Sequence, residues 1–167
     1  MASEPARVAG IDIDGVLADP SHRLHFVSGR PKNWKGFFSQ AHRDPPLPEG
    51  IQRVQELVTR GVAIVYVTGR PEYLRRPTRN WLADLGLPTD VMYMRPRGDF
   101  RPAPQVKLDV YRRIAVDYEI DVIWDDDTRV VETLRSAGFP VQWADWFTPD
   151  PVGQAALSDA QDEQGRS

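Results

Sequence analysis

The sequence predicts an α/β fold in which helices cover both faces of a parallel β-sheet. Short apolar runs alternate with stretches of helical periodicity, which is the pattern of successive βαβ units. One of these runs, residues 62–67, is apolar throughout, as expected for a strand that is buried on both sides. Several predicted strands end directly before charged or hydroxyl side chains, and this edge of an open α/β sheet is where ligands bind.

The individual elements follow from local spacing and from turn residues. The predicted strands are residues 7–14, 62–67, 91–94, 120–124 and 140–143. The predicted helices are residues 49–60, 71–85, 104–117 and 128–137. Each helix carries apolar side chains three or four positions apart, such as Val106, Val110 and Ile114. Most of the helices end before a glycine, which is a common helix stop. Right-handed crossovers then give a parallel sheet.

Residues 16–48 interrupt this alternation, because they are rich in proline and hold only one short aromatic segment of helical character. We expect a small cap that is inserted after the first strand and folds over its end. Its aromatic side chains, Trp34, Phe37 and Phe38, would either attach the cap to the domain or stack on a nucleobase. The prediction is a single domain of residues 1–148, followed by a small and polar tail, residues 149–167, that is flexible.

Composition excludes several classes of protein. The 167 residues suit one domain with a sizeable core. The sequence holds no run of 18 apolar residues and no signal-peptide pattern, so no membrane span is expected. The absence of cysteine excludes disulfides and thiolate metal sites, and it favours a cytoplasmic location. Neither a glycine-rich dinucleotide motif nor a P-loop motif occurs, which argues against a nucleotide-cofactor fold.

Positive charge is concentrated in the middle of the chain. Residues 70–113 hold ten Lys and Arg against five Asp and Glu, whereas residues 114–167 hold three against twelve. Basic loops between the middle strands favour an anionic substrate. A solvated basic face is the alternative interpretation of the same cluster.

Four groups of polar residues lie at or after the ends of the predicted strands. They are Asp12 with Asp14; Thr68 with Gly69 and Arg70; Arg95, followed by Lys107 on the next helix; and Asp125 with Asp126 and Asp127. If the strands are neighbours, all four groups face one crevice. A carboxylate cluster of this size needs a cation, and a ligand set made only of oxygen favours Mg²⁺. The first group taken alone is also typical of a simple turn, so the interpretation depends on the joint pattern.

Phosphoryl transfer is the chemistry that matches these residue types. A threonine hydroxyl, the backbone N–H groups that follow it and a lysine can donate hydrogen bonds to three phosphoryl oxygens. An aspartate can attack phosphorus, and a metal ion can offset the charge.

Taken together, these groups resemble the four motifs of the haloacid dehalogenase (HAD) superfamily of phosphohydrolases, in the family's order, over about residues 7–143. The matching segments are Asp12-Ile13-Asp14-Gly15-Val16, Val67-Thr68-Gly69-Arg70, Lys107 and Asp125-Asp126. The resemblance implies a Rossmann-like three-layer fold with a cap, Mg²⁺ as cofactor, and hydrolysis of phosphate monoesters through an aspartyl-phosphate.

Residues 67–70, 94–101 and 125–132 more specifically resemble the 3′-phosphatase domain of phage-type polynucleotide kinase/phosphatases. This resemblance implies a 3′-phosphorylated polynucleotide end or a nucleotide as substrate. The sequence has no attached P-loop kinase domain. A domain alone could act on mononucleotides, so the sequence does not decide between a mononucleotide and a polynucleotide substrate.

The resemblance also implies a role for each motif residue. Asp12 is expected to attack phosphorus, and Asp14 to donate a proton to the leaving oxygen, which requires surroundings that raise the pKa of Asp14. Thr68 and Lys107 complete the expected catalytic set. The expected metal site consists of Asp12, the main chain of Asp14, Asp125 and, less directly, Asp126. Asp127 is expected either to join this cluster or to cap the helix at residue 128. The expected substrate contacts are Gly69, Arg70 and Arg95. His22 and Arg23 are added as candidate contacts from their place in the cap, just after the first strand, and not from the resemblance.

Two other functions are compatible with this pattern of residues. A HAD phosphatase of 5′-nucleotides, sugar phosphates or another small metabolite would carry the same four motifs. A receiver-like phospho-switch also arranges acids, a threonine and a lysine around a doubly wound sheet, but it places the phosphorylated aspartate on a middle strand. The expected partner is a phosphorylated nucleotide or nucleic-acid end and not a membrane, and the sequence leaves monomer and homodimer open.

Overall fold

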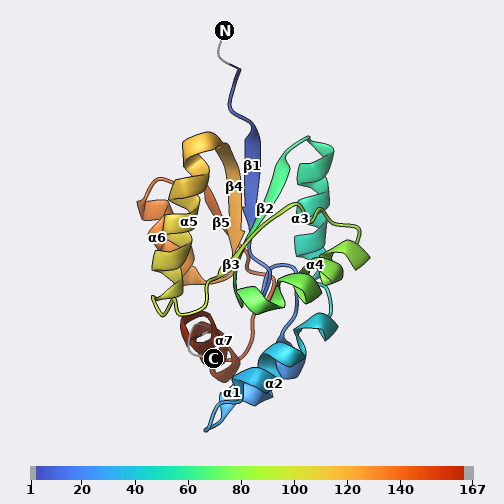
Figure 1. Ribbon diagram of the computed structural model, residues 1–167, viewed down its shortest axis with the longest axis vertical. Helices are drawn as coiled ribbons and strands as arrows, with labels where there is room; N and C mark the ends of the chain where they lie inside the picture. The colour runs from blue at the N-terminus through green and yellow to red at the C-terminus, as the bar shows by residue number, and fades with distance from the viewer. Residues whose placement is uncertain (1–2, 164–167) are drawn as a thin grey trace.

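A computed structural model describes residues 3–163 and contains one five-stranded parallel sheet (Figure 1). The strands are β1 (Arg7–Ile11), β2 (Ala63–Pro71), β3 (Val91–Arg95), β4 (Glu119–Asp125) and β5 (Val141–Trp143). Their order across the sheet is β3-β2-β1-β4-β5, and every pair is parallel. The chain therefore starts at the centre of the sheet and adds strands on either side.

Two pairs of helices cover the two faces of the sheet, so the predicted three-layer α/β fold is confirmed. Helices α3 (Pro48–Thr59) and α4 (Arg75–Asp84) lie on one side, and α5 (Ala103–Asp117) and α6 (Thr128–Ser136) lie on the other (Figure 1). Each pair buries its own apolar cluster against the sheet, with Val54 and Leu82 in one cluster and Val110 and Leu134 in the other. Burial of these faces is the main source of stability for the layers.

The sheet register brings the carboxyl ends of the three central strands together. Ile11, the last residue of β1, pairs with Tyr66 of β2 on one side and with Trp124 of β4 on the other. The N–H group of Asp12 continues this ladder by donating to the carbonyl of Trp124 at 3.0 Å. Residues that follow β1, β2 and β4 consequently share one edge of the sheet.

The insertion after β1 is a small helical cap at this edge (Figure 1). It contains the short helices η1 (Ser21–Arg23), α1 (His25–Ser28), α2 (Trp34–Ser39) and η2 (Ala41–Arg43). The aromatic segment, expected as one helix, thus forms two, α2 and η2. Phe37 and Phe38 are buried in the same core cluster as the sheet residues Ile11 and Tyr66. This burial favours their interpretation as the residues that attach the cap.

The C-terminal segment differs from the expected flexible tail. Residues Pro151–Glu163 form helix α7, which lies beside α1 below the strand ends (Figure 1). Its small and apolar side chains Ala156, Leu157 and Ala160 are buried in the cluster that also holds the cap. Composition suggested disorder because small residues carry a weak hydrophobic signal, but three of them at helical spacing suffice for packing. The final residues, 164–167, lie outside the described part of the chain.

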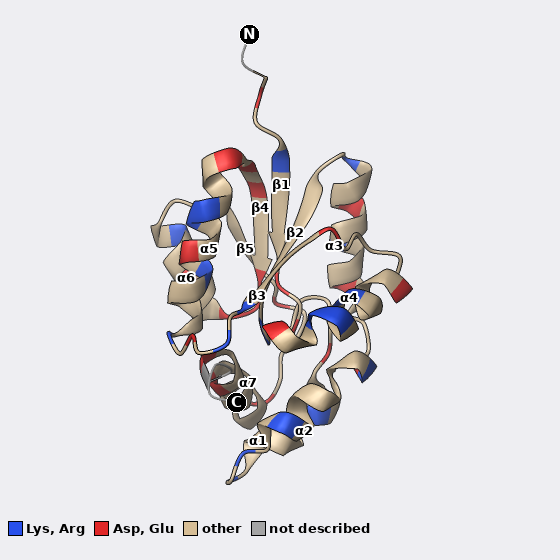
Figure 2. Cartoon of the chain, viewed as in Figure 1, with Lys and Arg blue, Asp and Glu red and all other residues tan. Residues whose placement is uncertain are grey.

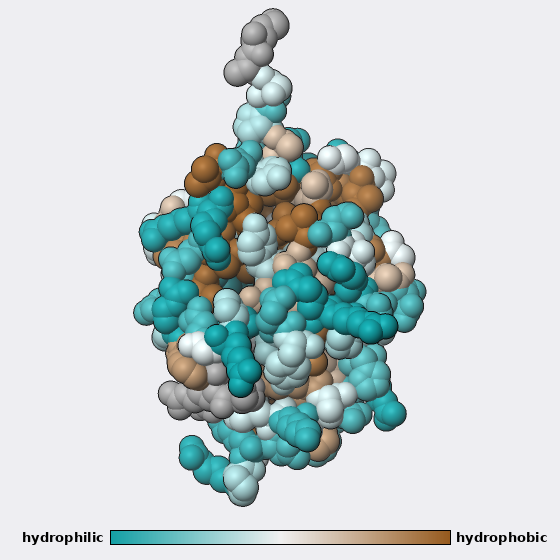
Figure 3. Space-filling view, in the orientation of Figure 1, coloured by the Kyte–Doolittle hydropathy of each residue, from teal (hydrophilic) through white to brown (hydrophobic). Residues whose placement is uncertain are grey.

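The two ends of the sheet differ in the surface that they present. Figure 3 shows brown, apolar atoms gathered in the upper half of this face and mostly teal atoms in the lower half. Between residues 3 and 163 no helix has the length and apolar character that crossing a bilayer requires. The hydrophilic end is the one that carries the polar strand tips.

Candidate active site

The structure brings most of the predicted polar groups to the carboxyl edge of the sheet. Asp12 follows β1, Thr68 lies in the last part of β2, and Asp125 ends β4. Lys107 reaches the same place from α5, and in Figure 2 acidic segments lie near the lower ends of β1 and β4. All four side chains are at least nine-tenths buried, so their charges interact in a medium that screens poorly.

Asp12 lies at the centre of this edge. Its Oδ1 accepts a hydrogen bond from the N–H of Ile13 at 2.8 Å, and its Oδ2 lies 3.1 Å from Nζ of Lys107. Burial and the charges of Asp125 and Asp14 raise the pKa of Asp12, Lys107 lowers it, and the net result is a pKa of about 7. A cation placed beside this carboxylate would favour its ionised form.

Asp12, Asp125 and Asp126 form a buried triad in which one carboxylate oxygen of each residue lies within 4.8 Å of the others. Oδ1 of Asp125 accepts from the N–H of Asp127 at 3.0 Å, and its Oδ2 accepts from Lys107 at 2.6 Å. Burial raises the pKa of Asp125, and burial together with the charges of Asp12 and Asp125 raises the pKa of Asp126 well above its usual range. Among the described residues, Oδ1 of Asp126 is buried without a hydrogen-bond partner, and Oδ2 of Asp12 has only its ion pair with Lys107. Oxygen ligands with unused lone pairs and excess negative charge are the donor set that suits Mg²⁺.

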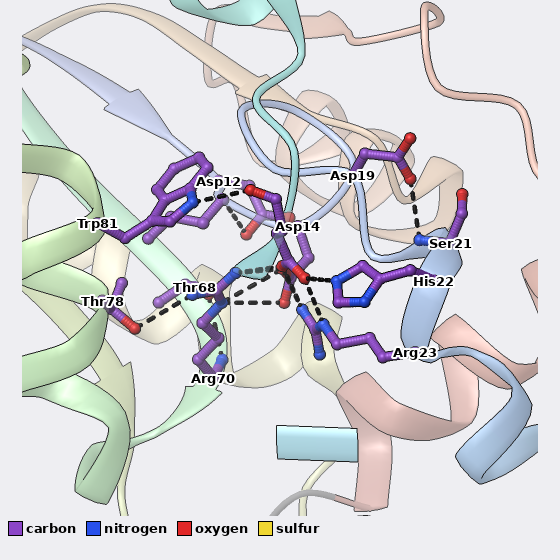
Figure 4. A network of polar contacts seen from close by, with 12 residues as sticks. Asp12, Asp14, Asp19, Ser21, His22, Arg23, Thr68, Arg70, Thr78 and Trp81 are labelled. Carbon is purple, nitrogen blue, oxygen red and sulfur yellow. Dashed lines mark hydrogen bonds and ion pairs between the residues drawn. The ribbon is translucent and has the colours of Figure 1, made fainter. Parts of the chain in front are cut away.

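Asp14 lies in a network of charged side chains that includes Arg23 and Arg70 (Figure 4). Its Oδ1 accepts from Nη2 of Arg23 at 2.8 Å and from Nη2 of Arg70 at 2.7 Å. Burial alone would raise the pKa of Asp14, but the charges of Arg70 and Arg23 outweigh it and lower the pKa to about 2. The expectation that its surroundings raise this pKa is therefore wrong for the structure described here, because that expectation left out the two arginines.

The segment after Val67 supplies hydrogen-bond donors next to the acidic triad. Oγ1 of Thr68 accepts from the N–H of Arg70 at 3.1 Å, which is a contact typical of a hydroxyl in a turn. A hydroxyl that accepts one hydrogen bond can still donate its own proton. Gly69 is buried between these two residues, so the segment presents backbone as well as side chains.

Three other predicted residues lie at the margins of the site. Arg95 is buried, and its guanidinium donates to the carbonyl of Arg101 at 2.7 Å and to the carbonyl of Gln161 in α7. His22 is partly exposed, and its Nε2 lies 2.7 Å from Oδ1 of Asp44. Asp127 is the N-cap of α6 and accepts from the N–H of Arg129 at 2.9 Å, so the capping interpretation is confirmed. Among the described contacts, Arg95 thus binds backbone carbonyls and not the acidic cluster.

Asp44 is a member of the network that sequence reasoning missed. Its side chain is fully buried and contacts both Arg23 and Arg70. The residue stands in a proline-rich loop and belongs to no recognised motif. The only signal was a charged residue directly before two prolines, which by itself indicates an extended turn.

Comparisons with known proteins agree with this geometry. Residues 7–145 match a family model described as the polynucleotide kinase PNKP phosphatase domain. Curated protein sequences give no match. One similar solved structure is a Pnkp1/Rnl/Hen1 RNA repair complex, with a TM-score of 0.68 and 22% identity over 85% of this chain and 44% of that chain. The chain thus spans less than half the length of that relative.

Two further structures share the fold at lower similarity. The class C acid phosphatase from Bacillus anthracis with tungstate bound gives a TM-score of 0.62 and 15% identity over 94% of this chain and 80% of that chain. The D,D-heptose 1.7-bisphosphate phosphatase from B. bronchiseptica, complexed with magnesium and phosphate, gives a TM-score of 0.51 and 21% identity over 83% of this chain and 79% of that chain. Because the family model covers most of the chain, the protein belongs to the PNKP phosphatase domain family, a group of phosphatases within the HAD superfamily.

Proposed function

We propose that this phosphatase is a Mg²⁺-dependent phosphomonoesterase that forms an aspartyl-phosphate on Asp12 and removes 3′-phosphates from polynucleotide ends or nucleotides. One observation supports this proposal above all others. The buried carboxylate of Asp12 pairs with Lys107 beside two further carboxylates, while Asp14 lies in a separate ion-pair network with two arginines. This separation provides a nucleophile and a distinct group for proton transfer.

The proposed reaction has two steps. In the first, an oxygen of Asp12 bonds to phosphorus, the ester P–O bond breaks, and Asp14 gives a proton to the leaving oxygen. In the second, water attacks the aspartyl-phosphate, Asp14 takes a proton from that water, and the bond between phosphorus and Asp12 breaks. Inorganic phosphate leaves, and both aspartates return to their starting states.

The phosphoryl oxygens would be held by donors that the structure places around Asp12. We assign them to the hydroxyl of Thr68, the backbone N–H of Gly69 and the ammonium group of Lys107. Nη1 of Arg23 is buried and has no hydrogen-bond partner among the described residues, which makes it a further donor for a substrate oxygen. Arg70 borders the same space through its contact with Asp14.

The low pKa of Asp14 has to change before this residue can act as an acid. A phosphate monoester carries up to two negative charges and would compete with Asp14 for the guanidinium groups of Arg23 and Arg70. Substrate binding itself would therefore weaken the interactions that keep Asp14 ionised and would raise its proton affinity. The same arginines would hold the ionised form again after the proton has left.

Asp12, Asp125 and Asp126 would hold Mg²⁺ together with the main-chain carbonyl of Asp14. The buried Oδ1 of Asp126, which has no hydrogen-bond partner among the described residues, fits such an ion. When bound, Mg²⁺ would offset the repulsion between the Asp12 carboxylate and the phosphate.

The substrate class is proposed from the family and from charge. The family is that of polynucleotide kinase phosphatase domains, and basic residues are concentrated between residues 70 and 113. The RNA repair complexes with a similar fold support a nucleic-acid end, although this chain covers less than half of theirs. A 5′-nucleotide, a sugar phosphate or another small metabolite is the alternative, because the same four motifs would serve it.

A substrate panel tests the proposal. The purified full chain is assayed with Mg²⁺ on 3′-phosphorylated oligonucleotides, 3′- and 5′-mononucleotides and sugar phosphates, and we expect the 3′-phosphorylated substrates to give the highest kcat/KM. Asp12→Asn should abolish turnover and EDTA should suppress it, whereas Asp117→Asn, an exposed change on α5, should leave it intact. Full turnover by Asp12→Asn would refute the nucleophile, and a preference for sugar phosphates would refute the substrate class.

A further inference from the structure

Asp44 occupies a fixed position between the cap and the sheet. Its carbonyl accepts a hydrogen bond from Nε1 of Trp81 in α4 at 2.9 Å. Its ψ of 128° is the extended conformation that a residue before proline prefers, and the carbonyl of the following Pro45 accepts from the N–H of Asp19 at 2.9 Å. The backbone on either side of this carboxylate is thus held by contacts with two other parts of the fold.

The carboxylate of Asp44 binds both arginines of the site. Arg23 contacts it side-on, with Nε 2.8 Å from Oδ1 and Nη2 2.7 Å from Oδ2, and Nη2 of Arg70 lies 2.9 Å from the same Oδ2. Nε2 of His22 adds a contact of 2.7 Å to Oδ1. Bidentate arginine–carboxylate pairs fix direction as well as distance, so Asp44 determines where both guanidinium groups point.

The same two nitrogens that contact Asp44 also hold Asp14. Nη2 of Arg23 and Nη2 of Arg70 each lie within 2.9 Å of both carboxylates. Two buried positive charges are therefore balanced by two negative charges, one at the reaction centre and one in the cap loop. Removal of the Asp44 charge would leave both arginines with Asp14 as their only carboxylate in this network, and the arginines would shift toward Asp14.

We propose that Asp44 is a positioning residue for proton transfer, which acts through Arg23 and Arg70 to set the place and direction of the Asp14 carboxylate. Asp44 itself touches neither the acidic triad nor, by this proposal, the substrate. By holding Arg23 at two nitrogens it also keeps the unpartnered Nη1 of that residue in place for a substrate oxygen. The inference rests on the proposed function, because it takes Asp14 as the proton donor.

The leaving group provides the first test. An alkyl phosphate needs a proton at its leaving oxygen, whereas p-nitrophenyl phosphate needs little help, because p-nitrophenolate is stable. We expect Asp44→Asn to lower kcat for an alkyl phosphate roughly 10- to 100-fold, which is part of the roughly 100- to 10,000-fold that general acid catalysis contributes, and to lower it far less for p-nitrophenyl phosphate. KM should change less than kcat. Asp19→Asn is the matched control, since Asp19 lies near Asp44 and accepts from the backbone of Ser21, which an Asn can also do.

A double-variant cycle separates positioning from a merely structural role. Asp44→Asn should cost no further activity in an Asp14→Asn background, because residues that act as a unit are not additive. An equal loss in both backgrounds, or a loss that ignores the leaving group, would overturn the inference while leaving the proposed function intact. Full turnover of the alkyl phosphate by Asp14→Asn would overturn both.

A thermal melt is recorded for each variant to establish that it folds. If Asp44→Asn does not fold, Asp44→Glu keeps the charge and displaces it by one methylene, and the same cycle is run with that variant. A leaving-group-dependent loss that vanishes without Asp14 supports the inference, and a uniform loss refutes it.

Discussion

Lys107 and Asp125 form a buried ion pair in which Nζ lies 2.6 Å from Oδ2, and the same Nζ lies 3.1 Å from Oδ2 of Asp12. Burial of the ammonium group lowers its pKa, but the charges of Asp12 and Asp125 raise it by more, so the group stays protonated. One lysine thus bridges a residue that follows β1 and the last residue of β4. Without it the triad would carry uncompensated negative charge in a buried place.

Lys107→Met keeps most of the side-chain volume and removes the charge. We expect kcat to fall about 100- to 1000-fold, the usual cost of losing one donor to developing negative charge. Lys35→Met, an exposed change in α2, is the matched control and should leave kcat within a factor of two or so. Steady-state kinetics at saturating Mg²⁺ provide the measurement, and comparable turnover by the two variants would remove Lys107 from the site.

The convergence of Lys107 with the acidic triad could be predicted from sequence because it follows from topology. Parallel strands deliver their carboxyl ends to one edge, and helical periodicity placed Lys107 on the helix that precedes β4. The direction of Asp14 could not be predicted in this way. A regular strand would point Asp12 and Asp14 to one face, but β1 ends at Ile11 and the chain turns at Gly15, whose φ is 82°.

The remaining features depend on contacts between distant segments. Asp44 lies 30 positions after Asp14, in a loop that carries no motif, and only the folded cap brings the two carboxylates onto shared arginines. Helix α7 was missed for a related reason, because it packs against α1, which lies more than 100 residues earlier in the chain, and against β2. Local patterns do not contain such pairings.

Position 15 requires glycine, because the side chain of Asp126 lies close to the backbone of the loop that follows β1. A Cβ at this position would lie 2.1 Å from Oδ2 of Asp126, and the positive φ is strained for any residue with a side chain. Gly15→Ala should therefore displace Asp126 and weaken Mg²⁺ binding, measured as a higher Mg²⁺ concentration at half-maximal activity. Gly29→Ala is the control, because the space around Gly29 is open and its φ is −107°. An unchanged Mg²⁺ requirement in Gly15→Ala would contradict the role of Asp126.

Magnesium should stabilise the fold more at high pH than at low pH. The folded pKa of Asp12 is about 7, raised from 3.8, so protonated Asp12 favours the metal-free fold below about pH 4, and this contribution is lost as the pH rises to about 7. Metal binding needs the ionised carboxylate and therefore opposes that loss. At a Mg²⁺ concentration 100 times Kd the expected stabilisation is about 2.7 kcal/mol.

Thermal melts with Mg²⁺ and with EDTA at pH 5 and pH 8 measure this coupling. The difference in Tm between the two conditions should be large at pH 8 and small at pH 5. Asp12→Asn, which carries no titrating group at this position, should reduce the pH dependence of the difference. A Tm difference that is equal at both pH values would contradict metal binding by Asp12.

We expect the docking of α7 to depend on Asp162, whose side chain contacts both α5 and α6. Its Oδ1 accepts from the N–H of Ala103 at 3.1 Å, at the start of α5, where no side chain of α5 provides a cap, and its Oδ2 lies 2.8 Å from Nη1 of Arg129. Arg129 is 40% exposed, so the ion pair contributes little and the capping contact dominates. Asp162→Asn keeps an acceptor but loses the charge at a helix N-terminus, and we expect a loss of about 1 kcal/mol in unfolding free energy. Asp159→Asn breaks an exposed pair with Lys32 and should cost less, so equal Tm values for the two variants would show that α7 is not held at Asp162.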